Sequence, residues 1–270
     1  MILKGIGILS LVLAVVAGVT GNLWLLPVYF IGSFAGLFLL AALFCVIVCA
    51  TVDLNKPVAQ EKPFYRAVLY PYVELLMNLF LVKLETEGLE KIPADGRFLL
   101  VCNHQQFADP GILLHCFPKS QLTFISKQEN RKLPLINKFM HAIRCQLIDR
   151  DNDRQALRAI IECIRMIKAD EVSVAVFPEG YTSRDGKLHH FRPGVFKIAQ
   201  KTGVPIVVCT INGTRPLFHN IKRLKRSPVE LHLVEVIPAA ELAGRTTVEI
   251  SDRVYASMIA DLGEEYRAAE

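Results

Sequence analysis

The chain has 270 residues, of which 52% are hydrophobic and 21% charged, with a formal net charge of +5. This charge is too small to predict a nucleic-acid partner, and the chain is more apolar than an average soluble protein. Its seven cysteines are odd in number and lie in apolar runs, which predicts reduced, buried thiols and excludes a disulfide framework or a structural zinc site.

The excess of apolar residues lies at the N-terminus, where residues 5–52 include no charged residue. A membrane-spanning helix needs about 20 apolar residues, so this segment is long enough for two. We predict helices at about 5–21 and 28–51. Gly21-Asn22 and Pro27 supply the turn between them.

The distribution of basic residues predicts the orientation of this hairpin. Lys4 precedes the first helix, and the connecting turn has no Lys or Arg. Three basic residues follow the second helix: Lys56, Lys62 and Arg66. We therefore expect an integral membrane protein with both termini and the active site on the cytoplasmic side. Two alternatives stay open: a signal peptide in residues 1–20 and a hairpin that lies within one leaflet.

A polar connector at residues 53–62 is followed by apolar side chains at helical spacing over 63–84, with Pro71 as a kink. This helix would lie on the membrane or pack on the next domain. The predicted division is therefore a membrane hairpin (1–52), a connector with an interfacial helix (53–84) and a third domain (85–270).

From residue 85 onward, short apolar runs alternate with helical periodicity. The predicted strands are 97–102, 122–126, 144–148, 172–177, 205–210 and 230–236. The predicted helices are 110–116, 134–141, 152–168, 193–202 and 246–262. Strands separated by helices of this length predict an α/β domain whose mostly parallel sheet is flanked by helices.

His104 and Asp109 follow the first predicted strand and are five positions apart. On a regular helix they would point in different directions, so they meet only if a turn lies between them. Asp109 before Pro110 is typical of a helix start, with Asp109 as the N-cap. A histidine oriented by a carboxylate can deprotonate a hydroxyl group near neutral pH. In the alternative, Asp109 only caps a helix. Backbone N–H groups at the helix start after Asp109 could stabilise an oxyanion.

A second group of polar residues follows the strand at 172–177. Glu179 could hold a substrate hydroxyl or orient backbone groups, and Arg184 could contact a phosphate. A surface turn is the alternative. Arg150 and Lys127 each follow a strand and are candidate cations.

Three other features have simpler explanations. Cys102 is a conceivable nucleophile, but buried structural cysteines are far commoner. His189-His190 has no partner at a familiar metal-ligand spacing, so we predict no metal site. The basic residues at 222–226 are most often a solvated face, although beside a membrane anchor they could contact lipid headgroups or an acidic carrier protein.

Four blocks in this order resemble the 1-acyl-sn-glycerol-3-phosphate acyltransferase family. They are Asn103-His104 with Asp109, Ile148-Asp149-Arg150, Phe177-Pro178-Glu179-Gly180 and Val204-Pro205-Ile206. The resemblance covers roughly residues 85–215. It implies transfer of a fatty acyl group from acyl-CoA or acyl-carrier protein to lysophosphatidic acid, which gives phosphatidic acid, with no cofactor.

The same resemblance implies the roles of individual residues. His104 and Asp109 match the catalytic pair. The residues at positions that match acceptor binding are Lys127, Arg150, Glu179, Gly180, Ser183 and Arg184. Family members often continue the Glu-Gly block with Thr-Arg-Ser, whereas here the arginine is displaced to position 184. Arg184 at its displaced position, Arg192 or Lys197 could therefore take over phosphate recognition.

Competing functions follow from the same residues. The acceptor could be another lysolipid or glycerol 3-phosphate. A hydrolase would use His104 to activate water, but this needs a closed pocket or a metal. A lipid-binding membrane protein without activity is a third class, which the intact pair His104 and Asp109 disfavours.

Overall fold

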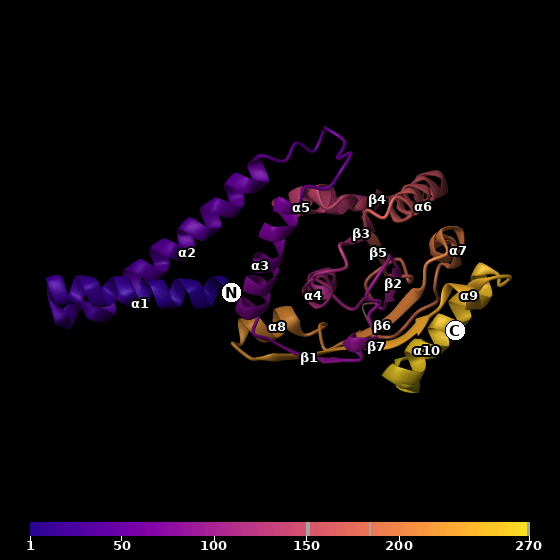
Figure 1. Ribbon diagram of the computed structural model, residues 1–270. Coiled ribbons are helices and arrows are strands. Elements are labelled where there is room, and N and C mark those ends of the chain that lie inside the picture. Colours follow the sequence, from indigo (N-terminus) through magenta and orange to yellow (C-terminus); the bar gives the residue numbers. More distant parts are fainter. Residues whose placement is uncertain (150–151, 184, 269–270) are drawn as a thin grey trace.

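The computed structural model describes residues 1–149, 152–183 and 185–268. Two apolar helices, α1 (Ile2–Thr20) and α2 (Leu26–Ala50), form the predicted hairpin, which projects away from the rest of the chain (Figure 1). A short 3₁₀ turn, η1 (Leu23–Leu25), joins them, and the side chain of Asn22 caps it by accepting from the N–H of Trp24. Both helices are long and apolar enough to cross a membrane.

Helix α3 (Pro63–Leu79) packs on the α/β domain and on the start of the hairpin. Its Arg66 is buried, forms an ion pair with Glu61 at 2.5 Å and donates to the carbonyl of Leu122 at 2.9 Å. On the same helix, Glu74 forms an ion pair with the amino group of Met1. Helix α3 therefore connects the apolar hairpin to the sheet.

The predicted end of this helix at residue 84 is wrong. The helix stops at Leu79, Leu81 has a positive φ of 53°, and strand β1 begins at Val82. Residues 82–85 alternate apolar and polar side chains, which is a strand pattern, and Val82–Glu87 pair with β7. The sheet thus starts inside the segment that the sequence assigned to the interfacial helix.

The sheet has seven strands in the order β1-β7-β6-β2-β5-β3-β4. Their bounds are Val82–Glu87, Ser227–Ile237, Ile206–Asn212, Leu99–Cys102, Ser173–Val176, Leu122–Lys127 and Gln146–Ile148. Only the β6–β7 pair is antiparallel among the described strands. The prediction of a mostly parallel sheet flanked by helices is confirmed, and each predicted strand is present with ends shifted by up to three residues.

Helices cover both faces of the sheet (Figure 1). The helices after α3 are α4 (Asp109–Cys116), α5 (Ile136–Ala142), α6 (Asp153–Lys168), α7 (Lys197–Thr202), α8 (Leu217–Lys222), α9 (Ala239–Leu242) and α10 (Thr247–Leu262). Four 3₁₀ turns are also present: η2 (Leu89–Lys91), η3 (Gln128–Lys132), η4 (Pro193–Phe196) and η5 (Glu264–Tyr266). The short helices α8 and α9 were not predicted.

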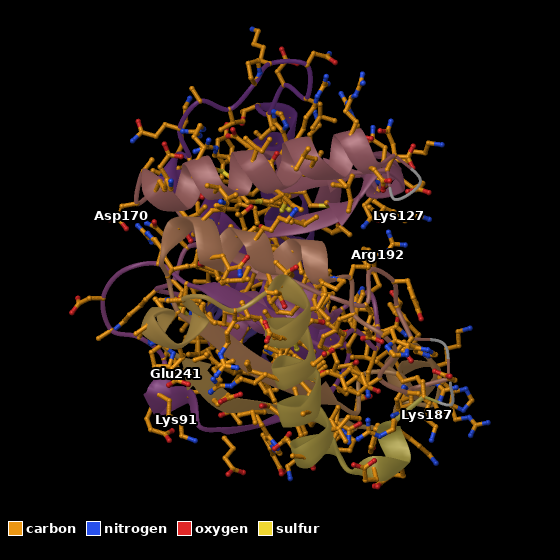
Figure 2. All side chains as sticks on the ribbon, turned by 90° about the vertical axis from the view of Figure 1, so that its right-hand side faces the viewer. Lys91, Lys127, Asp170, Lys187, Arg192 and Glu241 are labelled. Carbon is orange, nitrogen blue, oxygen red and sulfur yellow. The ribbon has the colours of Figure 1, made fainter. Side chains whose placement is uncertain are left out.

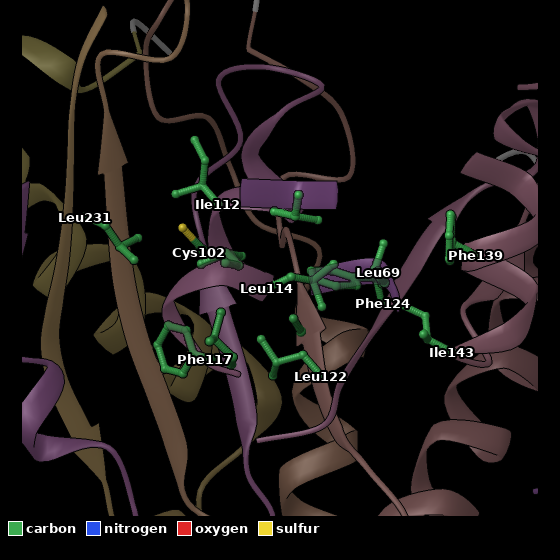
Figure 3. Packing of buried hydrophobic residues seen from close by; sticks show 14 of the residues in the cluster. Leu69, Cys102, Ile112, Leu114, Phe117, Leu122, Phe124, Phe139, Ile143 and Leu231 are labelled. Carbon is green, nitrogen blue, oxygen red and sulfur yellow. The ribbon is translucent and has the colours of Figure 1, made fainter. Parts of the chain in front are cut away.

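Strand β2 separates two apolar cores because its successive side chains point to opposite faces. Leu100 and Cys102 join the core under α3 and α4, whereas Leu99 and Val101 join the core under α6, α7 and α10. Figure 3 shows Cys102 near Ile112 and other side chains of the first core. With both faces buried, β2 is a rigid support for the loop that follows it.

Candidate active site

A pocket of about 680 Å³ lies where the parallel strands β2, β3, β4 and β5 end. Ligands bind at this edge of open parallel sheets because the loops after the strands meet there. One part of its wall is apolar, with Ile125, Ile148 and Val195. Another part carries Lys127 and Arg192, which Figure 2 shows on the same side of the domain.

His104 and Asp109 are in contact. The Nδ1 of His104 is 2.8 Å from the Oδ2 of Asp109, and the aspartate is fully buried. The same Oδ2 accepts the backbone N–H groups of Gln105 and Gln106, at 2.7 and 2.8 Å. The predicted turn between the two residues is therefore present, and the carboxylate holds both the turn and the imidazole.

The prediction of Asp109 as the N-cap is wrong by one residue, and the alternative in which Asp109 only caps a helix is wrong with it. Helix α4 begins at Asp109 itself, with Ala108 as the N-cap. The N–H groups of Gly111 and Ile112 donate to the carbonyl of Ala108, and Pro110 has no N–H. We also expected this helix start to stabilise an oxyanion, but these hydrogen bonds leave its first turn without a spare donor for one.

Aromatic packing fixes the plane of the His104 ring. The ring stacks on Phe177 with centroids 4.1 Å apart and an interplanar angle of 21°. Phe177 in turn lies parallel to Phe124, at 6.4 Å. Since Nδ1 contacts Asp109 and the ring lines the pocket, Nε2 is the nitrogen available to a bound molecule. In the described part of the chain, no group hydrogen-bonds to Nε2.

Glu179 orients backbone groups. Its Oε1 accepts the N–H of His104 at 3.0 Å, and its Oε2 accepts the N–H of His189 at 3.1 Å. The side chain is buried and does not line the pocket. Burial raises the pKa of this carboxyl to about 7, although the two N–H donors act in the opposite direction. Of the two roles considered, the geometry favours positioning over contact with a substrate hydroxyl.

The raised pKa of Glu179 predicts a pH dependence of stability. Because the folded state holds this proton more tightly, the free energy of unfolding should fall as pH rises from about 4.5 to about 7. Over this pH range, the ionisation of Glu179 should lower the free energy of unfolding by roughly 3 kcal/mol. The variant Glu179→Gln should lose this slope in urea unfolding measured across that range. The exposed Glu90→Gln is the matched control, and an unchanged slope in Glu179→Gln would contradict the assignment.

The residues around Glu179 shape the loop. Gly180 lines the pocket with a φ of +80°, and a Cβ there would lie 3.0 Å from the Nε of Arg192. Ser183 is buried, donates its N–H to the carbonyl of His104 at 2.8 Å and its hydroxyl to Asp185 at 2.9 Å. Ser183 therefore ties the two loops together and does not face the pocket.

The structure shows the positions of some, but not all, of the predicted cations. Lys127, at the end of β3, lines the pocket and forms an ion pair with Glu129 at 2.8 Å. Arg192 also lines the pocket, whereas Lys197 is exposed on α7 outside it. Arg150 and Arg184 lie outside the described residues. Of the candidates for the role of the displaced arginine, Arg192 is therefore the described one that lines the pocket.

Other residues of the pocket were not predicted as functional. His189 contacts the Oδ1 of Asp185 at 2.9 Å, and both line the pocket. The backbone N–H of Lys187 and the His189 ring lower the pKa of Asp185. No strand or helix pattern marks this loop, so only the neighbouring Glu-Gly block could have drawn attention to it.

The exclusion of Cys102 as a nucleophile agrees with the structure. Cys102 is fully buried in the apolar core, and burial raises the pKa of its thiol well above the usual range. A thiolate nucleophile is therefore disfavoured at this position. Across residues 1–149, 152–183 and 185–268, no group of three or more His, Cys, Asp or Glu side chains is arranged to hold a metal ion.

Known proteins share this site region. A match to the acyltransferase family covers residues 83–212, which contain the pocket-forming strands and loops. A Mycoplasma genitalium protein, named a probable 1-acyl-sn-glycerol-3-phosphate acyltransferase, is 30% identical over 197 residues, which are 72% of this chain and 72% of that protein. The chain belongs to the 1-acyl-sn-glycerol-3-phosphate acyltransferase family.

A second relative and a solved structure are also similar to this chain. A Mycoplasma pneumoniae relative of the same name is 35% identical over 60% of this chain, which spans 61% of that protein. The crystal structure of the 1-acyl-sn-glycerophosphate (LPA) acyltransferase PlsC from Thermotoga maritima matches with a TM-score of 0.65 and 25% identity, over 86% of this chain and 95% of that one. This chain and PlsC therefore share a fold over most of their lengths.

Proposed function

We propose that this protein transfers a fatty acyl group from acyl-CoA or acyl-carrier protein to the hydroxyl of lysophosphatidic acid, which gives phosphatidic acid. The observation that carries the proposal is the contact between His104 and Asp109 in a pocket that has both an apolar wall and cations. An acyl chain and a phosphate need these two kinds of surface. The names of the relatives support the same reaction.

The chemistry uses His104 as a general base. Nδ1–H donates to Asp109, which leaves Nε2 able to take the proton of the acceptor hydroxyl. The oxygen then attacks the carbonyl carbon of the thioester. When the tetrahedral intermediate collapses, the C–S bond breaks and the imidazolium returns its proton to the thiolate. The buried carboxylate of Asp109 stabilises the imidazolium during this cycle.

Lys127 and Arg192 are the described cations that we assign to the acceptor phosphate, because both line the pocket. Arg150 and Arg184 stay predictions from the family resemblance. Glu179, Gly180 and Ser183 act by holding the loop that carries these groups. No cofactor takes part in this proposal.

The two apolar helices indicate membrane association. A membrane location would bring the pocket to its lipid substrates. We propose that the hairpin sits in the bilayer with both termini and the pocket on the cytoplasmic side. The basic residues that flank the hairpin, Lys4 on one side and Lys56 and Lys62 on the other, support this orientation.

Gly180→Ala should raise the KM for the phosphorylated acceptor by about tenfold, since the added Cβ must displace the guanidinium of Arg192. The positive φ should also cost about 1–2 kcal/mol of stability. Steady-state kinetics with varied acceptor and thermal unfolding measure the two effects. Gly194→Ala is the control, because a Cβ there meets nothing within 4 Å. An unchanged acceptor KM in Gly180→Ala would contradict the role of Arg192.

The decisive experiment is a donor and acceptor panel on purified protein in vesicles. Labelled acyl-CoA and acyl-carrier protein are each offered with lysophosphatidic acid, another lysolipid and glycerol 3-phosphate. Formation of phosphatidic acid from lysophosphatidic acid supports the proposal. Release of free fatty acid would show a hydrolase, a different preferred acceptor would reassign the substrate, and no turnover would point to a binding protein.

A further inference from the structure

The turn between α8 and β7 concentrates positive charge. It reads Lys222-Arg223-Leu224-Lys225-Arg226, and all five residues are exposed. None of its four cations forms an ion pair with any residue that the structure describes. Lys4 is the one charged residue in 1–52, so residues 53–270 carry a net charge of +4. These four cations therefore account for the whole positive excess of the chain outside the hairpin.

The centre of the turn is occupied by an unusual residue. Leu224 has a φ of +52°, and its N–H donates to the carbonyl of Ile221 at 3.0 Å, while the N–H of Lys225 donates to Asn220 at 2.9 Å. These two bonds define a Schellman motif, in which the left-handed position is normally glycine. Leucine costs free energy there and is 81% exposed. Its side chain fills no gap in the fold and is free to contact a molecule outside the chain.

Charge at a helix end explains only part of the turn. Cations in the last turn of a helix interact favourably with the helix dipole, which accounts for Lys222 and Arg223. It does not account for Lys225 and Arg226 beyond the helix, nor for an exposed leucine among them. A strained, exposed apolar residue within a basic cluster points to a binding surface.

The position of the turn identifies what it faces. Ser227, directly after it, donates its N–H to the carbonyl of Leu81 at 3.0 Å, just past the end of α3. Phe218 of α8 packs edge-on against Phe80, with ring centroids 5.3 Å apart. Glu74 of α3 forms an ion pair with the amino group of Met1, where α1 begins. In Figure 1, α8 accordingly lies beside the start of α1, on the side from which the hairpin projects.

We propose that the turn 222–226 docks on the anionic surface of the bilayer that holds the hairpin, with Leu224 inserted at the headgroup level and the four cations on lipid phosphates. Polybasic segments bind anionic membranes in this way, and each cation is worth about a fivefold change in the docked fraction. The inference rests on the membrane attachment in the proposed function, but not on acyl transfer. Docking at this second point fixes the tilt of the α/β domain over the bilayer.

A tryptophan reporter tests the proposal. The chain has one tryptophan, Trp24, in the turn of the hairpin. Trp24→Phe combined with Leu224→Trp places the sole indole on the docking turn. In vesicles of phosphatidylcholine with phosphatidylglycerol, its emission should shift to the blue, and lipids brominated near the glycerol end should quench it. Both effects should be weak in pure phosphatidylcholine and should be lost in about 1 M salt, where the Debye length is about 3 Å.

The control variant carries the reporter at a similarly exposed apolar position elsewhere. Val248 is 53% exposed on α10, which lies on the side of the domain away from the hairpin in Figure 1. Trp24→Phe with Val248→Trp should show neither the shift nor the quenching. The parent protein with Trp24 reports on the hairpin itself. Quenching of Trp24 without quenching of the indole at 224 would overturn the inference while membrane attachment stands.

Two further variants separate binding from folding. Changing Lys222, Arg223, Lys225 and Arg226 to glutamine should abolish quenching of the reporter at 224. Leu224→Gly removes the backbone strain and should raise the thermal unfolding midpoint, yet it should lower the docked fraction by about tenfold. Because this variant has no indole at position 224, the docked fraction is measured from the fluorescence of a tryptophan introduced by Phe218→Trp, together with Trp24→Phe. A fall in unfolding midpoint with unchanged docking would make Leu224 purely structural and contradict the proposal.

An acidic carrier protein is the competing occupant of the turn. If the reporter at 224 ignores anionic vesicles and shifts only when acyl-carrier protein is added, the membrane inference is overturned. Because the reporter needs no turnover, its result is independent of the product assay. A protein that fails to acylate lysophosphatidic acid can still dock, and one that acylates it can fail to dock, so the two proposals can fail separately.

Discussion

Replacing His104 with alanine is expected to lower kcat/KM for acyl transfer by about 10²–10⁴-fold, the range for loss of a general base. The ring is held between Asp109 and Phe177, with Nε2 facing the pocket. No other described group occupies this place, so a neighbouring side chain should not substitute for it. Product formation from labelled acyl-CoA and lysophosphatidic acid measures the loss, with thermal unfolding and vesicle flotation to confirm that the variant folds and binds membranes.

A second histidine in the same chain offers a matched control. The Nδ1 of His232 lies 3.1 Å from both carboxylate oxygens of Asp261, in a separate pocket of about 80 Å³. His232→Ala therefore removes an imidazole paired with an aspartate without touching the proposed site. It should leave transfer unchanged. If His104→Ala retained more than a tenth of the activity, the general-base role would be wrong.

The sequence predicted the fold well where the chain is buried on both faces. Strand β2 and the first four residues of β6 are continuous apolar runs, and α6 repeats apolar residues at three- and four-residue steps. The edge strand β1 was missed because its neighbour is a helix with no glycine or proline between them. Only the positive φ of Leu81 marks the change, and leucine gives no sequence signal for it.

The site was predictable where local chemistry dominates. Asp109 before Pro110 indicated a helix start, and a turn there brings His104 back to the carboxylate. The role of Glu179 could not be read from its neighbours, because a carboxylate after a strand can face a ligand or backbone N–H groups. Tertiary structure decides, since the N–H of His189 comes from ten residues further along the chain.

The same limit explains the failed oxyanion prediction. A helix start offers N–H donors only if its first turn leaves them unbonded. A shift of the helix boundary by one residue made Ala108 the cap and let its carbonyl take up the N–H groups of Gly111 and Ile112. Boundaries at this precision depend on how the loop packs, which the pattern of apolar residues does not encode.

Asp109 concentrates three interactions on one atom. Its Oδ2 meets the His104 ring and the N–H groups of Gln105 and Gln106, whereas Oδ1 is buried without a hydrogen-bond partner among the described residues. An amide in place of the carboxylate has two orientations. In one, its NH₂ group faces the N–H groups of Gln105 and Gln106; in the other, the NH₂ group is buried without a partner at the position of Oδ1. In both cases the protein loses the negative charge that, in the proposed mechanism, stabilises the imidazolium.

Asp109→Asn is therefore expected to lower kcat by between about 10² and 10⁴-fold, with a much smaller change in the acceptor KM. The separation is expected because Asp109 does not line the pocket and, in the proposed mechanism, acts on the imidazolium that forms during reaction. Steady-state kinetics with varied lysophosphatidic acid measures both constants. Asp261→Asn is the matched control and should leave both unchanged. If Asp109→Asn raised the acceptor KM and left kcat near the wild-type value, the carboxylate would serve binding, and His104 would lack the partner that its role as a base requires.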